Sequence, residues 1–229
     1  YVFNGLSSYL TMTILEREDL LDFEQVVRNL LNNEYPLDLF SPALQFMQLG
    51  SESVDPYNFA QYWRGSTGQP LGNHIFLING FNDETTTPRG IDHLTLSAQI
   101  PIFDAPGWDI DPQNIGLPDL VSLPVTGNVN SFAGHPLTIA TYLDPKEGHF
   151  TVYRNPTLRK MTIRFWETAL SEPTPILQAS NELLCSDGVD DDLDELIDCQ
   201  DQDCVQREPC IETQCTDNLD GDHDGLIDC

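Results

Sequence analysis

Basic residues are scarce in this chain. Its 229 residues include 10 Lys and Arg against 37 Asp and Glu, and the formal net charge is −27. A charge of this sign and size repels nucleic acid and anionic membrane surfaces, and it attracts cations. Long apolar runs are also missing, so no segment is predicted to span a membrane. These two shortages argue against a nucleic-acid partner and a transmembrane segment, and they favour a cation as ligand.

Cysteine is absent from the first 184 residues, and the tail that follows holds all six. Residues 181–229 also hold 17 acidic residues and a single basic one, Arg207. So abrupt a change in composition predicts a domain boundary, and the two prolines of residues 172–181 (EPTPILQASN) are typical of a linker. We therefore predict one domain over residues 1–171, a linker over 172–181 and an acidic tail over 182–229. The cysteines are Cys185, Cys199, Cys204, Cys210, Cys215 and Cys229.

An initiator Met and a signal peptide are also missing. The chain begins with Tyr1 to Phe3, which has the character of the middle of a strand, and it stops at Cys229, partway through a repeat. Both ends therefore predict a piece of a larger protein.

Three continuous apolar runs, at residues 1–3, 74–79 and 137–143, are typical of strands buried on both faces in a parallel sheet. Helical patterns lie between and after them, at 20–31, 41–49, 55–63, 90–100 and 156–170. The alternation predicts an α/β fold with a parallel sheet. Residues 10–66 are mostly helical, either as a cap over a pocket or as ordinary helices packed on a sheet face. Residues 101–136 are rich in Pro, Gly, Asp and Asn, which predicts a long irregular excursion.

Two of these strands are followed by a residue that carries chemistry. HIFLINGFND delivers Asp83 after the strand at 74–79, and Gly148-His149-Phe150 follows the strand at 137–143. An acid that orients a histidine base is one half of a hydrolytic triad. Glu84 is an alternative acid, and Asp144 is a weaker one. The remaining histidines before the tail, His74, His93 and His135, lack this setting and are expected to be structural.

This pattern resembles the C-terminal half of an α/β-hydrolase, whose triad follows the chain order Ser, acid, His. Gly80, Asp83 and Pro88 match the acid turn of that family, and Gly148 to Phe150 match its histidine turn. The resemblance covers roughly residues 1–170. It implies a secreted esterase, lipase or peptidase-like hydrolase, with Asp83 and His149 in the triad and a lipid or small-molecule ester or a peptide as substrate.

The nucleophile motif G-x-S-x-G occurs nowhere in the chain. Gly5-Leu6-Ser7-Ser8-Tyr9 comes nearest, with Tyr in place of the second Gly. We expect the nucleophile and the oxyanion hole to lie upstream of Tyr1, with Ser7 as the alternative. If the nucleophile lies upstream of Tyr1, we expect this chain alone to be inactive.

The acidic tail contains a repeat. CSDGVDDDLDELIDC (185–199) and CTDNLDGDHDGLIDC (215–229) share both cysteines, five aspartates and a Leu-Ile pair at an offset of 30 residues. Alternate aspartates on a tight loop supply the oxygen ligands that Ca²⁺ takes. The predicted calcium ligands are Asp190, Asp192, Asp194, Asp198 and Asp201 in the first copy, and Asp220, Asp222, Asp224 and Asp228 in the second.

So short and acidic a segment cannot bury a core of its own, so disulfides are expected to help order it. Spacing suggests Cys185–Cys199, Cys204–Cys210 and Cys215–Cys229, one of 15 possible pairings. Zinc is the competing use of these cysteines, and a disordered solvating segment is the other alternative. The pattern is similar to thrombospondin type 3 repeats and to acidic Cys repeats of secreted bacterial proteins, which implies extracellular calcium binding. The rival to a hydrolase is a non-enzymatic surface protein, with a degenerate hydrolase fold and the tail as its attachment.

Overall fold

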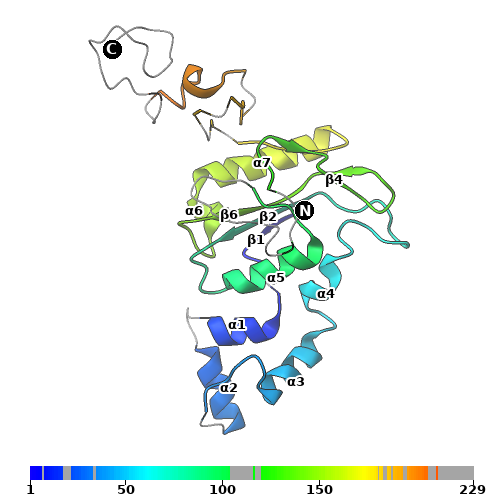
Figure 1. Cartoon of the computed structure of the whole chain (residues 1–229), viewed down its shortest axis with the longest axis vertical. Helices are drawn as coiled ribbons and strands as arrows, with labels where there is room; N and C mark the ends of the chain where they lie inside the picture. Colours follow the sequence, from blue (N-terminus) through cyan, green and yellow to red (C-terminus); the bar gives the residue numbers. More distant parts are fainter. Residues whose placement is uncertain are drawn as a thin grey trace, which may run out of the picture.

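The computed structural model describes residues 1–6, 8–17, 22–32, 35–103, 116, 120–179, 181–182, 185–186, 188–192, 195–205 and 210. A small parallel sheet lies at the centre of residues 1–179 (Figure 1). Its three strands are β1 (Val2–Asn4), β2 (Ile75–Gly80) and β6 (Ile139–Asp144), in the order β1-β2-β6. All six residues of β2 are buried, as its continuous apolar run predicts. The α/β class with a parallel sheet is therefore confirmed.

Helices cover both faces of this sheet (Figure 1). On one face, α5 (Pro88–Ala98) packs against β2 through Leu94 and Ala98. On the other face lie α6 (Thr151–Arg154) and α7 (Pro156–Ser171), whose Leu158, Met161 and Phe165 are buried against Phe76 and Ile78 of β2. Asn155 begins α7 as predicted, because its side chain accepts a hydrogen bond from the Leu158 amide at 3.2 Å and Pro156 follows it.

Residues 10–60 form a separate helical layer on the outer side of α5 (Figure 1). It consists of α1 (Leu10–Glu16), α2 (Phe23–Leu31), α3 (Pro42–Ser51) and α4 (Pro56–Ala60). The first three share a small core of Ile14, Val27, Leu37 and Leu44. An ion pair of 2.6 Å between Glu16 and Arg89 links α1 to α5. The layer reaches the sheet mainly through α5, and α4 ends at Ala60 rather than at the predicted Trp63.

The segment expected to be a linker is partly built into the core. Within it, β7 (Ile176–Leu177) pairs antiparallel with β3 (Val125–Thr126), and Leu177 and Ala179 are buried in the cluster around Phe165. A second small pair, β4 (Val129–Asn130) and β5 (Pro136–Leu137), falls in the predicted irregular stretch. Residues 176–179 are thus no extended spacer, whereas the domain boundary itself stays a prediction.

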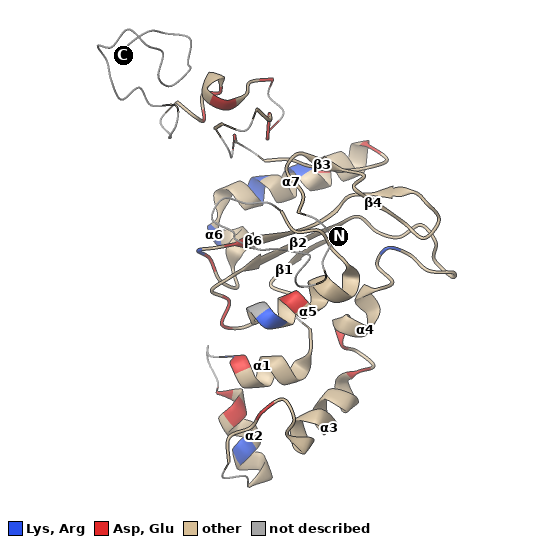
Figure 2. Ribbon diagram, in the orientation of Figure 1, with Lys and Arg blue, Asp and Glu red and all other residues tan. Residues whose placement is uncertain are grey.

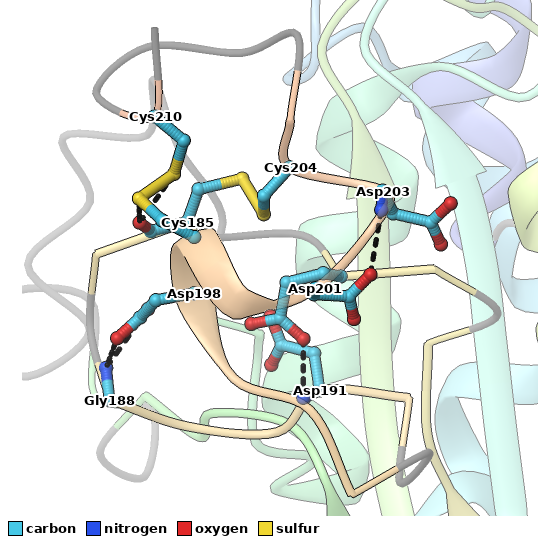
Figure 3. Close-up of a disulfide and its surroundings, with 10 residues drawn as sticks. Cys185, Gly188, Asp191, Asp198, Asp201, Asp203, Cys204 and Cys210 are labelled. Carbon is cyan, nitrogen blue, oxygen red and sulfur yellow. Dashed lines mark hydrogen bonds between the residues drawn. A yellow bond between two sulfur atoms is a disulfide. The ribbon is translucent and has the colours of Figure 1, made fainter. Parts of the chain in front are cut away.

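Two disulfides order the first part of the tail. They join Cys185 to Cys204 and Cys199 to Cys210, so the predicted pairs Cys185–Cys199 and Cys204–Cys210 are wrong (Figure 3). The reason is the turn that follows Ile197. Asp198 has a positive φ of 48°, and a short 3₁₀ helix spans Asp198–Gln200. The chain then returns, and the Cα of Cys204 lies 5.7 Å from that of Cys185. The predicted pair Cys215–Cys229 lies outside the described residues.

Acidic residues are spread over the helical layer and the tail, whereas Lys and Arg are few (Figure 2). Within the part of the chain that the structure describes, no helix has the length and apolar character needed to cross a membrane.

Candidate functional site

Asp83 and His149 meet at the carboxyl ends of β2 and β6. The two strands are parallel neighbours, with Gly80 opposite Asp144, so the loops that follow them emerge side by side. His149 Nδ1 lies 3.1 Å from Asp83 Oδ2. The Asp83 side chain has no exposed area, whereas 28% of the His149 side chain is exposed. The structure therefore brings the predicted pair together, with the acid buried and the imidazole open to solvent.

Asp83 is held by several donors besides His149. Its Oδ1 accepts the backbone amides of Thr85 at 2.8 Å and Thr86 at 2.7 Å, and its Oδ2 accepts the Thr86 hydroxyl. Thr86 Oγ1 also lies 3.2 Å from His149 Nδ1. A carboxylate bound in this way stays in one orientation and fixes the imidazole tautomer with a proton on Nδ1. That tautomer leaves Nε2 able to accept a proton.

Close packing around His149 depends on glycines that a larger residue could not replace without a clash. A Cβ on Gly80 would lie 2.1 Å from the Glu147 carbonyl oxygen. Gly5 has a φ of 62°, and a Cβ there would lie 2.7 Å from the imidazole ring of His149. These contacts let the two site loops and the end of β1 approach one another.

Asn4, the last residue of β1, holds the loop of His149. Its Nδ2 donates to the His149 carbonyl at 2.8 Å, and its Oδ1 accepts the Val152 amide at 3.2 Å. The roles of Asn4, Gly5 and Thr86 at this site were not predicted from the sequence, because they depend on how β1, β2 and the loop of His149 meet in space. The Asn4-Gly5 pair after the apolar run at residues 1–3 is the local sequence signal of this arrangement.

The alternative acids have other environments. Glu84 is exposed. Asp144 is buried, and it accepts the amides of Lys146 and Glu147 and the side chain of Asn155 at 2.7–3.0 Å. Asp144 thus shapes the turn that leads to His149.

The other histidines before the tail lie away from this pair. His74 Nδ1 accepts the Thr138 amide at 3.0 Å, and burial, followed by the nearby N-terminal charge, lowers the His74 pKa. His93 stacks on Tyr9 with 5.4 Å between ring centroids. His135 is exposed on the turn before β5. These surroundings agree with structural rather than catalytic roles.

An open cleft of about 650 Å³ runs along the outer edge of β1, beside His149. Val2 and Asn4 of β1 line one side, and Phe150, Ile163 and Trp166 of the helical face line the other. The last three side chains are about half exposed, although they are large and apolar. Among the described residues, no strand pairs with this edge of β1. Ser7, the alternative nucleophile, lies outside the described residues.

A second candidate site lies in the tail. Carboxylate oxygens of Glu182, Asp190 and Asp192 all lie within 4.8 Å of one another. Burial raises the pKa of Glu182 to about 7, and the charges of Asp191, Asp201 and Asp192 raise it further, whereas a hydrogen bond from the Asp191 amide opposes the shift. Several acids therefore surround one buried carboxyl, as a cation site requires. Glu182 was not predicted as a ligand, because it precedes the repeat.

The other predicted calcium ligands differ in their surroundings. Asp198 is not in this cluster, because its carboxylate accepts the Gly188 amide at 3.0 and 3.2 Å (Figure 3). Asp201 is 2% exposed, and its Oδ1 accepts the Asp203 amide at 2.7 Å. The sulfurs of Cys185, Cys204 and Cys210 also lie together, but they are in disulfides and are poor metal ligands. Asp194, Asp220, Asp222, Asp224 and Asp228 lie outside the described residues.

Comparisons with known proteins add no relative. No protein-family model matches the chain, and neither a curated protein nor a solved structure matches it.

Proposed function

We propose that Asp83 and His149 are the acid and the base of a hydrolase that cleaves esters or amides. The observation that carries this proposal is the contact between His149 Nδ1 and the buried Asp83 carboxylate, at the carboxyl ends of two adjacent parallel strands. The hydrogen bonds from Thr85 and Thr86 support it, since they orient the carboxylate and, through it, the imidazole.

In this mechanism, His149 Nε2 takes the proton of a nucleophilic hydroxyl as its oxygen attacks the carbonyl carbon of the substrate. The imidazolium that forms is stabilised by ionised Asp83. When the tetrahedral intermediate collapses, His149 gives the proton to the leaving alcohol or amine. Water then repeats the cycle on the acyl intermediate and restores the free hydroxyl.

The cleft beside β1 supports a nucleophile from a segment that precedes Tyr1. A parallel strand added to the outer edge of β1 would end beside Asn4 and His149, and it would cover the exposed Ile163 and Trp166. Ser7, two residues after Gly5 in the sequence, is the alternative source. The two sources make different predictions for the 229-residue chain.

The tail supports a second role, the binding of calcium. Carboxylate oxygens are the ligands that Ca²⁺ prefers, and the cluster of Glu182, Asp190 and Asp192 provides three of them. Calcium sites of extracellular modules bind with Kd values of about 10⁻⁴–10⁻³ M, which we expect here. The two disulfides indicate an oxidising compartment. Secretion, or display on the cell surface through the tail, follows as part of the proposal.

The hydrolase proposal is tested with a fluorophosphonate probe, which labels activated serines, and with turnover of p-nitrophenyl butyrate. We expect both signals in a form of the protein that includes the segment before Tyr1. Asp83→Asn and His149→Ala should each abolish labelling, whereas His135→Ala, which changes an exposed histidine, should leave it unchanged. Labelling of the 229-residue chain that is lost in Ser7→Ala would instead identify Ser7 as the nucleophile. Absence of labelling in both forms, or full turnover in His149→Ala, would overturn the proposal and favour the non-enzymatic surface protein.

A further inference from the structure

The cluster around Glu182 joins two parts of the chain that the sequence separates. Glu182 lies in the segment that leaves the α/β core, three residues after buried Ala179. Asp190 and Asp192 belong to the acidic repeat. Their carboxylate oxygens and that of Glu182 lie within 4.8 Å of one another. Calcium–oxygen bonds of 2.3–2.6 Å place any two ligands of one ion no more than about 5 Å apart. The three oxygens therefore fit a single ion.

Hydrogen bonds already hold these two segments side by side. The Ala179 amide donates to the Asp191 carbonyl at 2.9 Å, and Gln178 Nε2 donates to the Asp192 carbonyl at 2.8 Å. The Asp191 amide donates to Glu182 Oε2 at 3.1 Å. Because of these bonds, the carboxylates of the repeat and of Glu182 face one region, which lies next to the core rather than in an isolated loop.

Asp201 supplies an independent observation that points to a ligand. It is 98% buried, and its Oδ2 has no hydrogen-bond partner among the described residues. Asp201 lies on the return path of the chain toward Cys204, on the same side as Asp191 (Figure 3). Its charge is one of those that raise the pKa of Glu182. A buried carboxylate oxygen without a donor is unfavourable unless a cation or a proton compensates it.

Basic residues are scarce in the sequence around Asp201, and Arg207 is the single one in residues 181–229. Residues 181–206 contain ten Asp and Glu and no Lys, Arg or His. A divalent cation can neutralise several carboxylates at once, and calcium accepts the six to eight oxygens that such a site can supply with backbone carbonyls and water.

We propose that Glu182, Asp190 and Asp192 bind one calcium ion, with the buried Asp201 carboxylate adding negative charge nearby, and that this ion fastens the acidic tail to the α/β domain. The inference rests on the calcium binding proposed above, and it differs from a repeat that binds the ion by itself. Glu182 makes the difference, because it lies outside the repeat and next to β7. The ion would thus hold residues 190–192 against residues 178–182, and through Leu177 and Ala179 against the core.

Calorimetric titration of the oxidised chain with CaCl₂ tests the ligand set. Glu182→Gln and Asp201→Asn should each lower the calcium affinity by about tenfold or more, because each replaces a negatively charged carboxylate of the site by a neutral amide. The matched controls are Glu195→Gln and Asp203→Asn, which remove the same charges from exposed positions of the tail. The controls should change the affinity less than about twofold.

The outcomes separate this inference from the calcium function. The largest Kd that we expect is about 10⁻³ M. If the unmodified chain binds no calcium at about 10⁻² M, ten times this Kd, the proposed calcium function itself fails. If the chain binds calcium and Glu182→Gln binds it as tightly as Glu195→Gln, calcium binding stands, but the proposal that the ion fastens the tail to the α/β domain is overturned.

Hydrogen exchange of the unmodified chain provides a measurement that needs no variant. Calcium should slow exchange at the Ala179 and Asp191 amides, because both lie in the contact between the core segment and the repeat. Slower exchange confined to residues 195–205 would contradict the proposal that the ion fastens the tail to the α/β domain. This result holds even if the substituted proteins fail to fold.

Discussion

Replacement of Gly80 by alanine tests whether the site depends on close contact between the loops after β2 and β6. The added Cβ would lie 2.1 Å from the Glu147 carbonyl oxygen and 2.5 Å from the Glu147 carbonyl carbon. Both are backbone atoms, so no side-chain rotation relieves the overlap. The two loops must separate by about 1 Å to restore ordinary contact distances.

The cost follows from the contacts that this separation disturbs. The Asn82 amide donates to the Glu147 carbonyl at 3.1 Å, and loss of this hydrogen bond costs about 1 kcal/mol. Overpacking of a closely packed region adds about 1–3 kcal/mol. A gain of about 0.5–1 kcal/mol from the restricted unfolded chain offsets part of this cost. We therefore expect Gly80→Ala to lower the free energy of unfolding by about 1–3.5 kcal/mol.

Urea unfolding followed by circular dichroism measures this loss, and proton NMR of the imidazole ring reports on the site. His149 follows Glu147 by two residues, so its ring resonance should shift. Gly50→Ala is the matched control, because Gly50 lies in α3 and its added Cβ would meet nothing within 4 Å apart from its chain neighbours and the backbone of its own helix. The control should raise stability by about 0.5–1 kcal/mol. A Gly80→Ala protein as stable as the unmodified chain, or one with an unchanged His149 resonance, would refute the reasoning.

Two other predictions concern titration and the disulfides. Burial, followed by the charge of Asp144, raises the pKa of Tyr142 to about 12, so the unfolded chain loses this proton first and stability falls between pH 10 and about 12. Tyr142→Phe should remove this part of the alkaline destabilisation in unfolding curves, and an unchanged pH dependence would contradict the assignment. For the tail, replacement of Cys199 and Cys210 by serine opens a loop with a sequence separation of 11, which should destabilise the tail by about 3 kcal/mol. Limited proteolysis should then cut residues 185–210 faster while residues 1–179 resist, and equal rates of cleavage would oppose the prediction.

Local patterns were sufficient to predict the elements that position the site. Each apolar run without alternation contains a strand of the parallel sheet, although only β2 is fully buried and β1 is half-buried. Ser41-Pro42 and Asn155-Pro156 mark helix starts in the structure. The order of these elements also gave the contact between Asp83 and His149, because parallel neighbours deliver their following loops to the same edge.

Contacts between distant segments were not predictable in this way. Asn4 and Gly5 hold the loop of His149 only because β1 pairs with β2, and no local pattern specifies that pairing. The disulfide partners depend on the turn at Asp198, whose positive φ is unusual for a residue other than glycine. Glu182 was not predicted as a ligand because it precedes the repeat at residues 185–199, although its carboxylate lies in the same cluster.

The overlapping order of the two disulfides affects how the tail withstands cleavage. The bond from Cys185 to Cys204 encloses Cys199, and the bond from Cys199 to Cys210 encloses Cys204. Every peptide bond between residues 185 and 210 is therefore bypassed by at least one disulfide. A protease that cuts this stretch once leaves both halves covalently joined, so whatever follows Cys210 stays attached to the α/β domain. Cleavage within this stretch would therefore release the tail only after three cuts, one in each interval between successive cysteines, or after reduction.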